Sequence, residues 1–325
     1  MARDTTGLYA GAITEEKKRH FLIDLFARLV REKPLGTVGG VIVLLLLLTG
    51  ILADVVAPYG YNETWVGDKL ASPSGSFWLG TDNVGRDMLS RIIHGARVSV
   101  VVGLTVSALS TLISGVIGLV SGFLGGKTDI VIQRFVDAWM CFPALFIMIT
   151  IMAIVGTGLL QVIVVLGILY GITGSRTVRS AVIGIKENVY VEAARSIGCP
   201  TGSLLTRHIL PNIMAPLIIV FTSRMGAAII AEASLSFLGY GIPPPIPSWG
   251  GMLSGTGRRY MERAWWMAVM PGLALSIVVY GINMFGDALR DLLDPRLRGG
   301  LGRYSGVKRK LPKRQMRGST PVQGN

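Results

Sequence analysis

The chain has 325 residues, of which 50% are hydrophobic and only 16% are charged. With a mean hydropathy of +0.54, this composition excludes an ordinary soluble domain and indicates an integral membrane protein. The net charge of +13 comes from 32 basic and 19 acidic residues, so the positions of the basic residues relative to the apolar runs predict the orientation in the membrane.

Residues 1–35 are predicted to be a cytoplasmic segment with an amphipathic helix. Its apolar side chains recur at helical spacing among basic ones, which is typical of a helix on an anionic membrane surface, and a solvated lead-in helix is the alternative. The segment lacks the apolar core and cleavage site of a secretory signal, so no cleavable segment is expected before the first span. The apolar positions are Phe21, Leu22, Leu25, Phe26, Leu29 and Val30.

Residues 36–290 are predicted to form a transmembrane domain with an all-α fold. Residues 141–175 contain no charge, but one helix of that length would measure roughly 50 Å, against a bilayer core of about 30 Å. This stretch should therefore fold back at residues 156–158. The sequence predicts six transmembrane helices, near residues 36–57, 98–124, 141–157, 159–175, 211–239 and 265–287.

The basic residues alternate strongly between the connecting segments. The first, third, fifth and seventh segments hold 24 lysines and arginines, whereas the other three hold 7. Because basic residues collect on the cytoplasmic side, both termini and a loop at residues 176–211 should be cytoplasmic. The loops at residues 58–97 and 240–264 should face outward, and the basic residues 291–325 are predicted to be a disordered tail that contacts lipid rather than nucleic acid.

Two features near the second span concern glycine. Gly118, Gly122 and Gly126 are spaced by four, which suits close helix packing, either within the subunit or with a companion. The segment from Ser121 to Thr128 resembles a phosphate-binding loop, but Ser121 occupies the place of the first glycine and the segment ends an uncharged apolar run. We expect a helix end with a glycine turn, and no ATP site in this chain.

No catalytic site, metal site or cofactor is predicted. The three histidines and the two cysteines, Cys141 and Cys199, show no metal-ligand spacing, and no serine lies in a Gly-x-Ser-x-Gly elbow. Two ionisable residues, Arg224 and Glu232, fall inside the fifth predicted span. Eight positions separate them by about 12 Å along a helix, so they should not pair. Each is a candidate for the pore or a gate, with a structural bond as the alternative for Glu232.

A polar island at residues 190–212 separates two apolar runs. Small alanines, a fixed charge at Glu192 and a glycine at position 198 describe a short docking element. The island resembles the coupling-loop signature of ABC importer permeases, in which His208 takes the usual isoleucine position. The matching residues are Glu192, Ala193, Ala194, Gly198, Leu210 and Pro211.

Further segments resemble the oligopeptide, dipeptide and nickel branch of that family, in its second, C-type permease. They are Trp-Leu-Gly-Thr-Asp-Asn-Val-Gly-Arg-Asp at residues 78–87, Arg-His-Ile-Leu-Pro-Asn at 207–212, Ala-Glu-Ala-Ser-Leu-Ser-Phe-Leu-Gly at 231–239 and Pro-Ser-Trp-Gly at 247–250. Four matches in family order are far more specific than one.

The resemblance implies a non-enzymatic permease subunit in a bacterial or archaeal inner membrane. It implies a second, homologous permease subunit, two ATP-binding subunits that carry ATP and Mg²⁺, and an extracytoplasmic solute-binding protein. Oligopeptides or dipeptides are the expected cargo, with nickel as the alternative. Residues 78–97 are expected to combine a glycine turn with an amphipathic helix, marked by Met88, Leu89, Ile92 and Ile93, that covers the channel mouth. Asp82 and Arg86 of this segment either contact the binding protein or belong to a lid packed on the subunit itself.

Two readings from other classes compete with this one. A secondary transporter driven by an ion gradient would need paired or relayed acids inside its spans and usually an internal repeat, and the sequence shows sparse intramembrane charge and no evident repetition. A membrane scaffold comes third.

Overall fold

The computed structural model describes residues 21–293; the expectations for residues 1–20 and for the basic tail from residue 294 lie outside this range. The described residues are helical apart from their connecting segments. The elements are α1 (Phe21–Glu32), α2 (Pro34–Ile51), α3 (Ala53–Val56), α4 (Met88–Leu124), α5 (Gly126–Met140), α6 (Ala144–Val155), α7 (Leu159–Lys186), α8 (Val189–Ser196), α9 (Thr201–Ser203), η1 (Leu204–Ile209), η2 (Leu210–Ile213), α10 (Met214–Phe237), α11 (Trp249–Leu253), α12 (Gly255–Arg259) and α13 (Trp266–Leu293).

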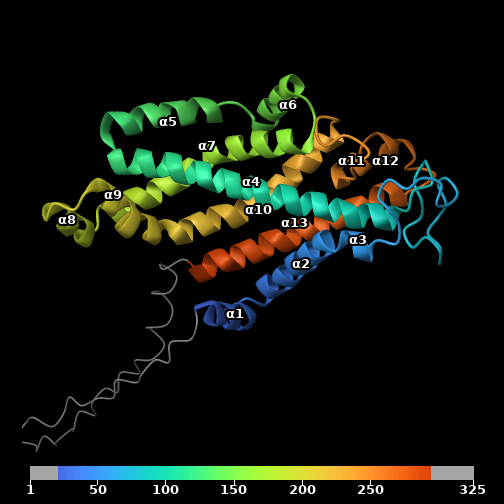
Figure 1. Cartoon of the computed structure of the whole chain (residues 1–325), viewed down its shortest axis with the longest axis horizontal. Helices are drawn as coiled ribbons and strands as arrows, with labels where there is room; N and C mark the ends of the chain where they lie inside the picture. Colours follow the sequence, from blue (N-terminus) through green and yellow to red (C-terminus); the bar gives the residue numbers. More distant parts are fainter. Residues whose placement is uncertain (1–20, 294–325) are drawn as a thin grey trace, which may run out of the picture.

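Five long helical segments are apolar enough to cross a membrane: α2, α4, α7, the run Thr201–Phe237 that ends in α10, and α13. They lie lengthwise in one bundle, with α8 at one end and α11, α12 and the loop before α4 at the other (Figure 1). This confirms the predicted all-α membrane fold.

A pair of shorter helices, α5 and α6, is bent by 86° at its break and has the composition of a broken span or a re-entrant loop. The predicted third span, residues 141–157, covers the second helix of this pair, and the first helix, α5, was not predicted. Charges in α5, including Asp129 and Asp137, hid it from a hydropathy reading. Pro143, which cannot donate a backbone hydrogen bond, precedes α6. The predicted fold-back is confirmed, because α6 ends at Val155 and α7 begins at Leu159.

The α4 and α7 helices pack closely through glycines. A Cβ at Gly118 would lie 2.7 Å from the Cβ of Val178, and one at Gly122 would lie 2.9 Å from that of Val182. Glycine therefore lets the two backbones approach. Of the two alternatives for these glycines, the structure shows packing within the subunit for Gly118 and Gly122. The expected glycine turn is also present, with φ of +66° at Gly125 between α4 and α5.

The α4 helix is longer than its predicted span. It starts at Met88, where the Asp87 side chain caps it by accepting a hydrogen bond from the Ser90 amide at 2.8 Å. Residues 88–97 are therefore helical, as expected, but they are the first turns of α4 and not a separate helix. The Asp87 cap starts the helix, and no proline follows within Met88–Leu124 to interrupt it, so residues 88–97 continue into the apolar span.

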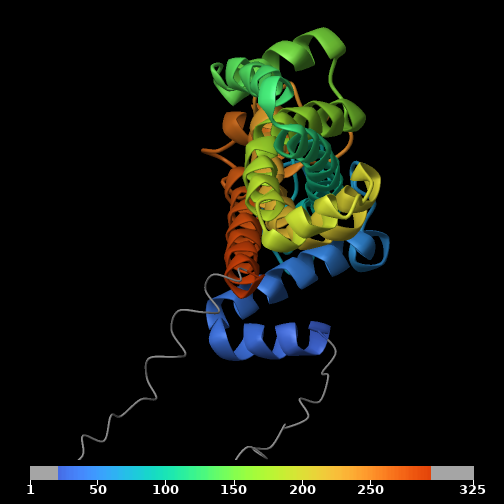
Figure 2. The ribbon, with the colours of Figure 1, turned by 90° about the vertical axis from the view of Figure 1, so that its left-hand side faces the viewer.

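Two polar contacts fasten short helices to the bundle. The Arg97 guanidinium donates to Asp54 of α3 at 2.7 and 3.1 Å, and this bond holds the pKa of Asp54 below its usual value. Lys33, just after α1, donates to Asp291 at 2.6 Å. Figure 2 shows α1 lying beside the first part of α2, away from the centre of the bundle; its Leu29 packs against Ala288 and Leu292 of α13.

Three apolar clusters form the core. One lies among α2, α4, α10, α11 and α13, and a second among α4, α6, α7 and α10. The third lies at the α8 end, where it joins α8 to α7 and to the start of the Thr201–Phe237 run. Its buried members are Phe123, Val178, Val182, Val191, Ala194, Leu204, Ile209, Ile213 and Val220.

Candidate functional site

The predicted coupling residues lie on and beside α8, at one end of the bundle (Figure 1). Val191 and Ala194 are buried in the third apolar cluster, while Glu192 and Ala193 are exposed. Two large apolar side chains also face away from the subunit, Val189 at 81% exposure and Ile197 at 85%. The helix thus has one face fixed to the bundle and another face with mixed charged and apolar groups available to a partner.

Gly198 ends α8 in a left-handed turn, with φ of +82°. The Gly198 amide donates to the Arg195 carbonyl at 3.0 Å, and the Cys199 amide donates to the Ala194 carbonyl at 3.1 Å. A side chain at this glycine would meet no atom within 4 Å, so the backbone angle rather than space requires glycine here. The positive φ of Gly198 therefore accounts for the end of α8 at this residue.

The chain then enters the long helical run without a break at Pro211. A π-helical turn, Leu204–Ile209, and a 3-10 turn, Leu210–Ile213, surround this proline. Proline lacks an N–H and clashes with the preceding turn of a regular α-helix, and these irregular turns accommodate it. The predicted fifth span, residues 211–239, therefore has helix in front of it as well.

The unmatched signature position is also explained. Ile209 is fully buried in the cluster below α8, while the ring centroid of His208 lies 6.4 Å from that of Tyr190 on α8. The Tyr190 hydroxyl in turn accepts a hydrogen bond from Asn212 at 3.2 Å. Ile209 supplies the core contact, one residue later in the chain than the signature places it, and His208 packs on α8.

A polar cluster that the sequence analysis missed joins α5 to the same end of the bundle. Asp129 of α5 accepts hydrogen bonds from Arg179 of α7 at 2.6 and 2.5 Å and from Ser121 of α4 at 2.5 Å. One turn away, Gln133 donates to Ser121 at 3.0 Å, and a further turn along, Asp137 pairs with Arg176. The spacing of four from 129 to 137 was the available signal, since it places the three polar groups of α5 on one face.

Arg224 lies half-buried on α10, next to α7. Its Nη2 is 3.4 Å from the Thr173 hydroxyl, and its guanidinium carbon is 5.0 Å from the Tyr170 ring centroid. A guanidinium over an aromatic face is stabilised by the ring quadrupole. Among the described contacts, Arg224 does not pair with Glu232. Glu232 lies 1% exposed further along the helix, where it accepts a 2.6 Å hydrogen bond from Ser236.

The Glu232 bond extends into the loop after α10. The Ser236 hydroxyl, besides donating to Glu232, accepts a hydrogen bond from the Ile242 amide at 3.1 Å. Ser248 caps α11 by accepting from the Gly251 amide at 3.1 Å. The carboxyl group therefore contributes to a structural bond within the fold, one of the two alternatives read from the sequence.

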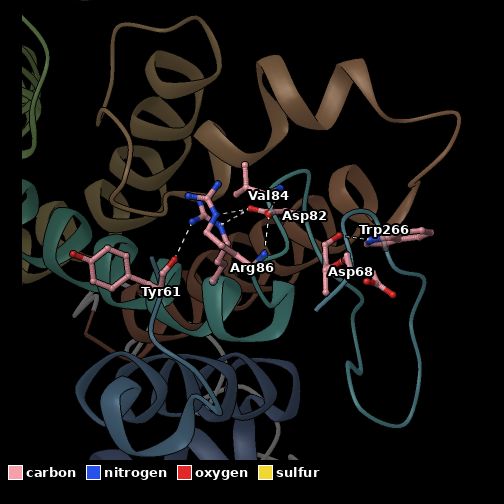
Figure 3. Close-up of polar contacts among 8 residues, drawn as sticks. Tyr61, Asp68, Asp82, Val84, Arg86 and Trp266 are labelled. Atoms are coloured by element: carbon pink, nitrogen blue, oxygen red, sulfur yellow. Dashed lines mark hydrogen bonds and ion pairs between the residues drawn. The ribbon is translucent and has the colours of Figure 1, made fainter. Parts of the chain in front are cut away.

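Asp82 organises the loop before α4 (Figure 3). Its carboxylate accepts hydrogen bonds from the amides of Val84 and Arg86 at 2.9 and 3.0 Å and from Arg86 Nε at 2.6 Å. Arg91, which the sequence analysis missed, lies 3.8 Å from the same carboxylate and donates to the Tyr61 carbonyl at 3.0 Å. Asp82 is only 3% exposed, so its present role is to hold the loop together.

The same end of the bundle is closed by two tryptophans. Trp249 donates to the Ile92 carbonyl at 3.1 Å, and Trp266 donates to the Thr81 carbonyl at 3.0 Å. Both indoles are nearly buried, so α11 and α13 are fixed to the loop and to α4. Their N–H groups are thus used inside the subunit.

Within residues 21–293, no three His, Cys, Asp or Glu side chains are grouped to hold a metal ion. Several polar clusters in this range join arginine to aspartate, and they hold helices or the loop before α4 in place. Their arrangement supports a membrane-embedded bundle with a docking helix at one end and a closed cap at the other.

Comparison with known proteins agrees with this architecture. Residues 114–299 match the family described as binding-protein-dependent transport system inner membrane component, and residues 22–73 match the N-terminal TM domain of oligopeptide transport permease C.

The chain is 41% identical to the putative peptide transport system permease protein of Brucella suis biovar 1, over 84% of this chain and 92% of the relative. It is 41% identical to the di/tripeptide transport system permease protein of Pseudomonas aeruginosa, over 81% and 89%. It is 37% identical to the oligopeptide transport system permease protein of Bacillus subtilis, over 82% and 88%. The chain therefore belongs to the family of binding-protein-dependent transport system inner membrane components, and it is a permease subunit of an ABC importer.

Proposed function

We propose that this permease forms half of a channel that imports oligopeptides or dipeptides, driven by ATP hydrolysis on separate subunits. The proposed assembly has a second, homologous permease subunit, two ATP-binding subunits that hold ATP and Mg²⁺, and an extracytoplasmic peptide-binding protein. The names of the relatives from Brucella suis, Pseudomonas aeruginosa and Bacillus subtilis, all of which refer to peptide transport, support this choice of cargo.

The observation that carries the mechanism is the double attachment of α8. Its buried side chains share one apolar cluster with Val178 and Val182 of α7 and with Ile209 and Ile213 before α10. A partner that moves α8 must therefore move two long helices together. This suits the rigid-body rocking by which transporters alternate between inward and outward access.

We place the α8 end in the cytoplasm and the α11 end outside, in a bacterial or archaeal inner membrane. The excess of basic residues in alternate segments supports this orientation. In this orientation the domains proposed from the sequence include a cytoplasmic coupling region around residues 176–211 and an outer segment before α4. In this arrangement Asp82 and Arg86 shape the outer segment that faces the binding protein.

Arg224 is proposed to lie along the translocation path. It is half-buried, and hydroxyl and ring groups rather than a carboxylate surround it, so an anionic group of the cargo would be attracted to it. Replacement of Arg224 by Gln should lower peptide uptake, measured with the reconstituted transporter at saturating binding protein. Unchanged uptake rate and affinity would exclude a role in the path.

The coupling role can be tested with two variants in the complete transporter. Glu192→Lys reverses an exposed charge on α8, and Gly198→Val places a β-branched side chain at a φ of +82°, which such residues avoid. Each should leave the permease in the membrane but reduce ATP-driven peptide uptake at least about tenfold, because close docking is lost.

Matched controls separate coupling from general damage. Glu262→Lys changes an exposed acid at the other end of the bundle, and Gly255→Val changes an exposed glycine outside the coupling region that, like Gly198, has no atom within 4 Å of an added Cβ. Both controls should transport normally. Normal uptake by the two test variants would refute the coupling role.

A further inference from the structure

The described residues line a partly open cavity of about 250 Å³ at the end of the bundle opposite α8. Its walls come from the loop before α4, the start of α4, the loop after α10, α11 and the start of α13. Its charged and hydroxyl lining is Asp82, Arg86, Arg91, Ser236, Ser248 and Ser254. Its apolar lining includes Met88, Met252, Met267 and Ile242.

The wall of this cavity carries more positive than negative charge. Two guanidinium groups, those of Arg86 and Arg91, share one carboxylate, that of Asp82. Asp82 already accepts two backbone amides as well as Arg86 Nε. Glu232 lies behind the wall, bonded to Ser236, and is not in the lining.

Hydrogen-bond donors are therefore left over in the wall. A guanidinium has five N–H donors, and the described contacts use Nε of Arg86 and Nη1 of Arg91, with Nε of Arg91 3.8 Å from Asp82. The two arginine side chains are 17% and 10% exposed, so they are shielded from bulk water. Partly desolvated guanidinium groups bind a carboxylate strongly and in a fixed geometry.

The size and the rest of the lining narrow the ligand further. Whole-ligand sites usually occupy about 300–1,000 Å³, so this cavity suits the end of a molecule rather than all of it. Methionine is unbranched and polarizable and fits varied apolar shapes, which suits side chains of different kinds. The matching chemistry is a carboxylate on a carbon that bears a variable side chain.

We propose that this cavity, between Arg86 and Arg91 on one side and Met252 and Met267 on the other, receives the C-terminal residue of a peptide, with its α-carboxylate on the two arginines. The proposal rests on the proposed function in peptide import. It assigns to this permease its own point of recognition for the cargo, separate from that of the binding protein.

The test places a competing carboxylate inside the cavity without removing either arginine. Ser254 lines the cavity, and among the described contacts its hydroxyl donates to the Gly251 carbonyl at 3.0 Å. Ser254→Asp should neutralise the site, whereas Ser254→Asn has almost the same shape and no charge. In the complete transporter, S254D should lower the maximal import rate of free-acid peptides about tenfold, with S254N close to the unmodified protein.

A photo-cross-link provides a readout that needs neither ATP nor transport. The probe is the tripeptide Ala-Ala-photo-leucine, compared with its C-terminal amide, and the transporter is assembled in nanodiscs. Mass spectrometry should locate the cross-link of the free acid at Met252 or Met267. The cross-link should be weak for the amide and for S254D, and it should persist in S254N.

Three outcomes would overturn the proposal. The first is no cross-link in the cavity. The second is a cross-link equally strong for free acid and amide. The third is an equal loss of import for acid and amide peptides in S254D together with a higher half-saturating concentration of binding protein, since the cavity would then take an acidic group of the binding protein. Failure of the proposed function is a separate result, namely no ATP-driven peptide import by the unmodified complex.

Discussion

Asp129 shows how a charged residue in the first turn of α5 is held against the bundle. Its side chain is 15% exposed and accepts hydrogen bonds from both Arg179 and Ser121. Each partner comes from a different helix, so this one carboxylate holds α5 against α4 and α7. The bond is charge-assisted on the Arg179 side and is stronger than a bond between neutral groups.

Replacement of Asp129 by Asn should lower the free energy of unfolding by about 2 kcal/mol, because the amide keeps the shape but loses the charged bond to Arg179. Thermal unfolding in detergent, followed by the fluorescence of the buried tryptophans Trp249 and Trp266, measures the change. Lys127→Gln, at an exposed position of the same helix, is the control and should be neutral. Equal stability of D129N and the unmodified protein would show that the pair contributes little.

At the same scale, the sequence indicated some site residues and missed others. Glu192, Gly198 and Pro211 stand in one short segment, so their order along the chain was enough to mark them. Arg91 was missed because its partners, Asp82 and the Tyr61 carbonyl, come from a loop whose path is set only by folding. Contacts between distant segments leave no local pattern to read.

The α4–α7 contact is a close helix pairing whose cause, the glycines spaced by four, is visible in the sequence. A Cβ at Gly118 would also lie 2.8 Å from the Arg179 backbone nitrogen and 2.8 Å from the Ser175 carbonyl oxygen. Backbone atoms cannot move aside as a flexible side chain can. The contact therefore depends on glycine itself and not merely on a small residue.

Gly118→Ala should separate α4 from α7 and lower the free energy of unfolding by about 1–3 kcal/mol. Gly115→Ala on the same helix should be neutral, since an added Cβ would meet only Leu217 at 3.6 Å, an ordinary contact. Unfolding of the two variants in the same detergent gives the comparison. If the two glycines prove equally tolerant, the close approach of the helices is not required for stability.

Hydropathy located most of the long helices, but it failed where charges are paired inside the bundle or where a proline is tolerated. The α5 helix was missed because Asp129 and Asp137 lower its apolarity, although Arg179 and Arg176 compensate them. The run Thr201–Phe237 was cut at Pro211 because a proline usually ends a helix. Neither the ion pairs nor the irregular turns can be derived from local composition.

At the scale of the whole molecule, the orientation of the bundle is open to a direct test. In a cysteine-free background, Ile197→Cys and Trp78→Cys place thiols at positions that are 85% and 71% exposed, at opposite ends of the bundle. A membrane-impermeant thiol reagent applied to intact cells should label position 78 and not position 197, because basic residues keep the α8 end inside. The reverse pattern would invert the proposed topology.

The length of α4 has a mechanical consequence. Its 37 residues make a rod of about 55 Å, well beyond the roughly 30 Å of hydrocarbon that it crosses. One end carries Ser121, bonded to Asp129, and the other carries Arg91 beside Asp82. A stiff rod that tilts about its middle swings its tips in opposite directions, like a seesaw. If α4 tilts as one rigid body, the channel widens at one face of the membrane as it narrows at the other.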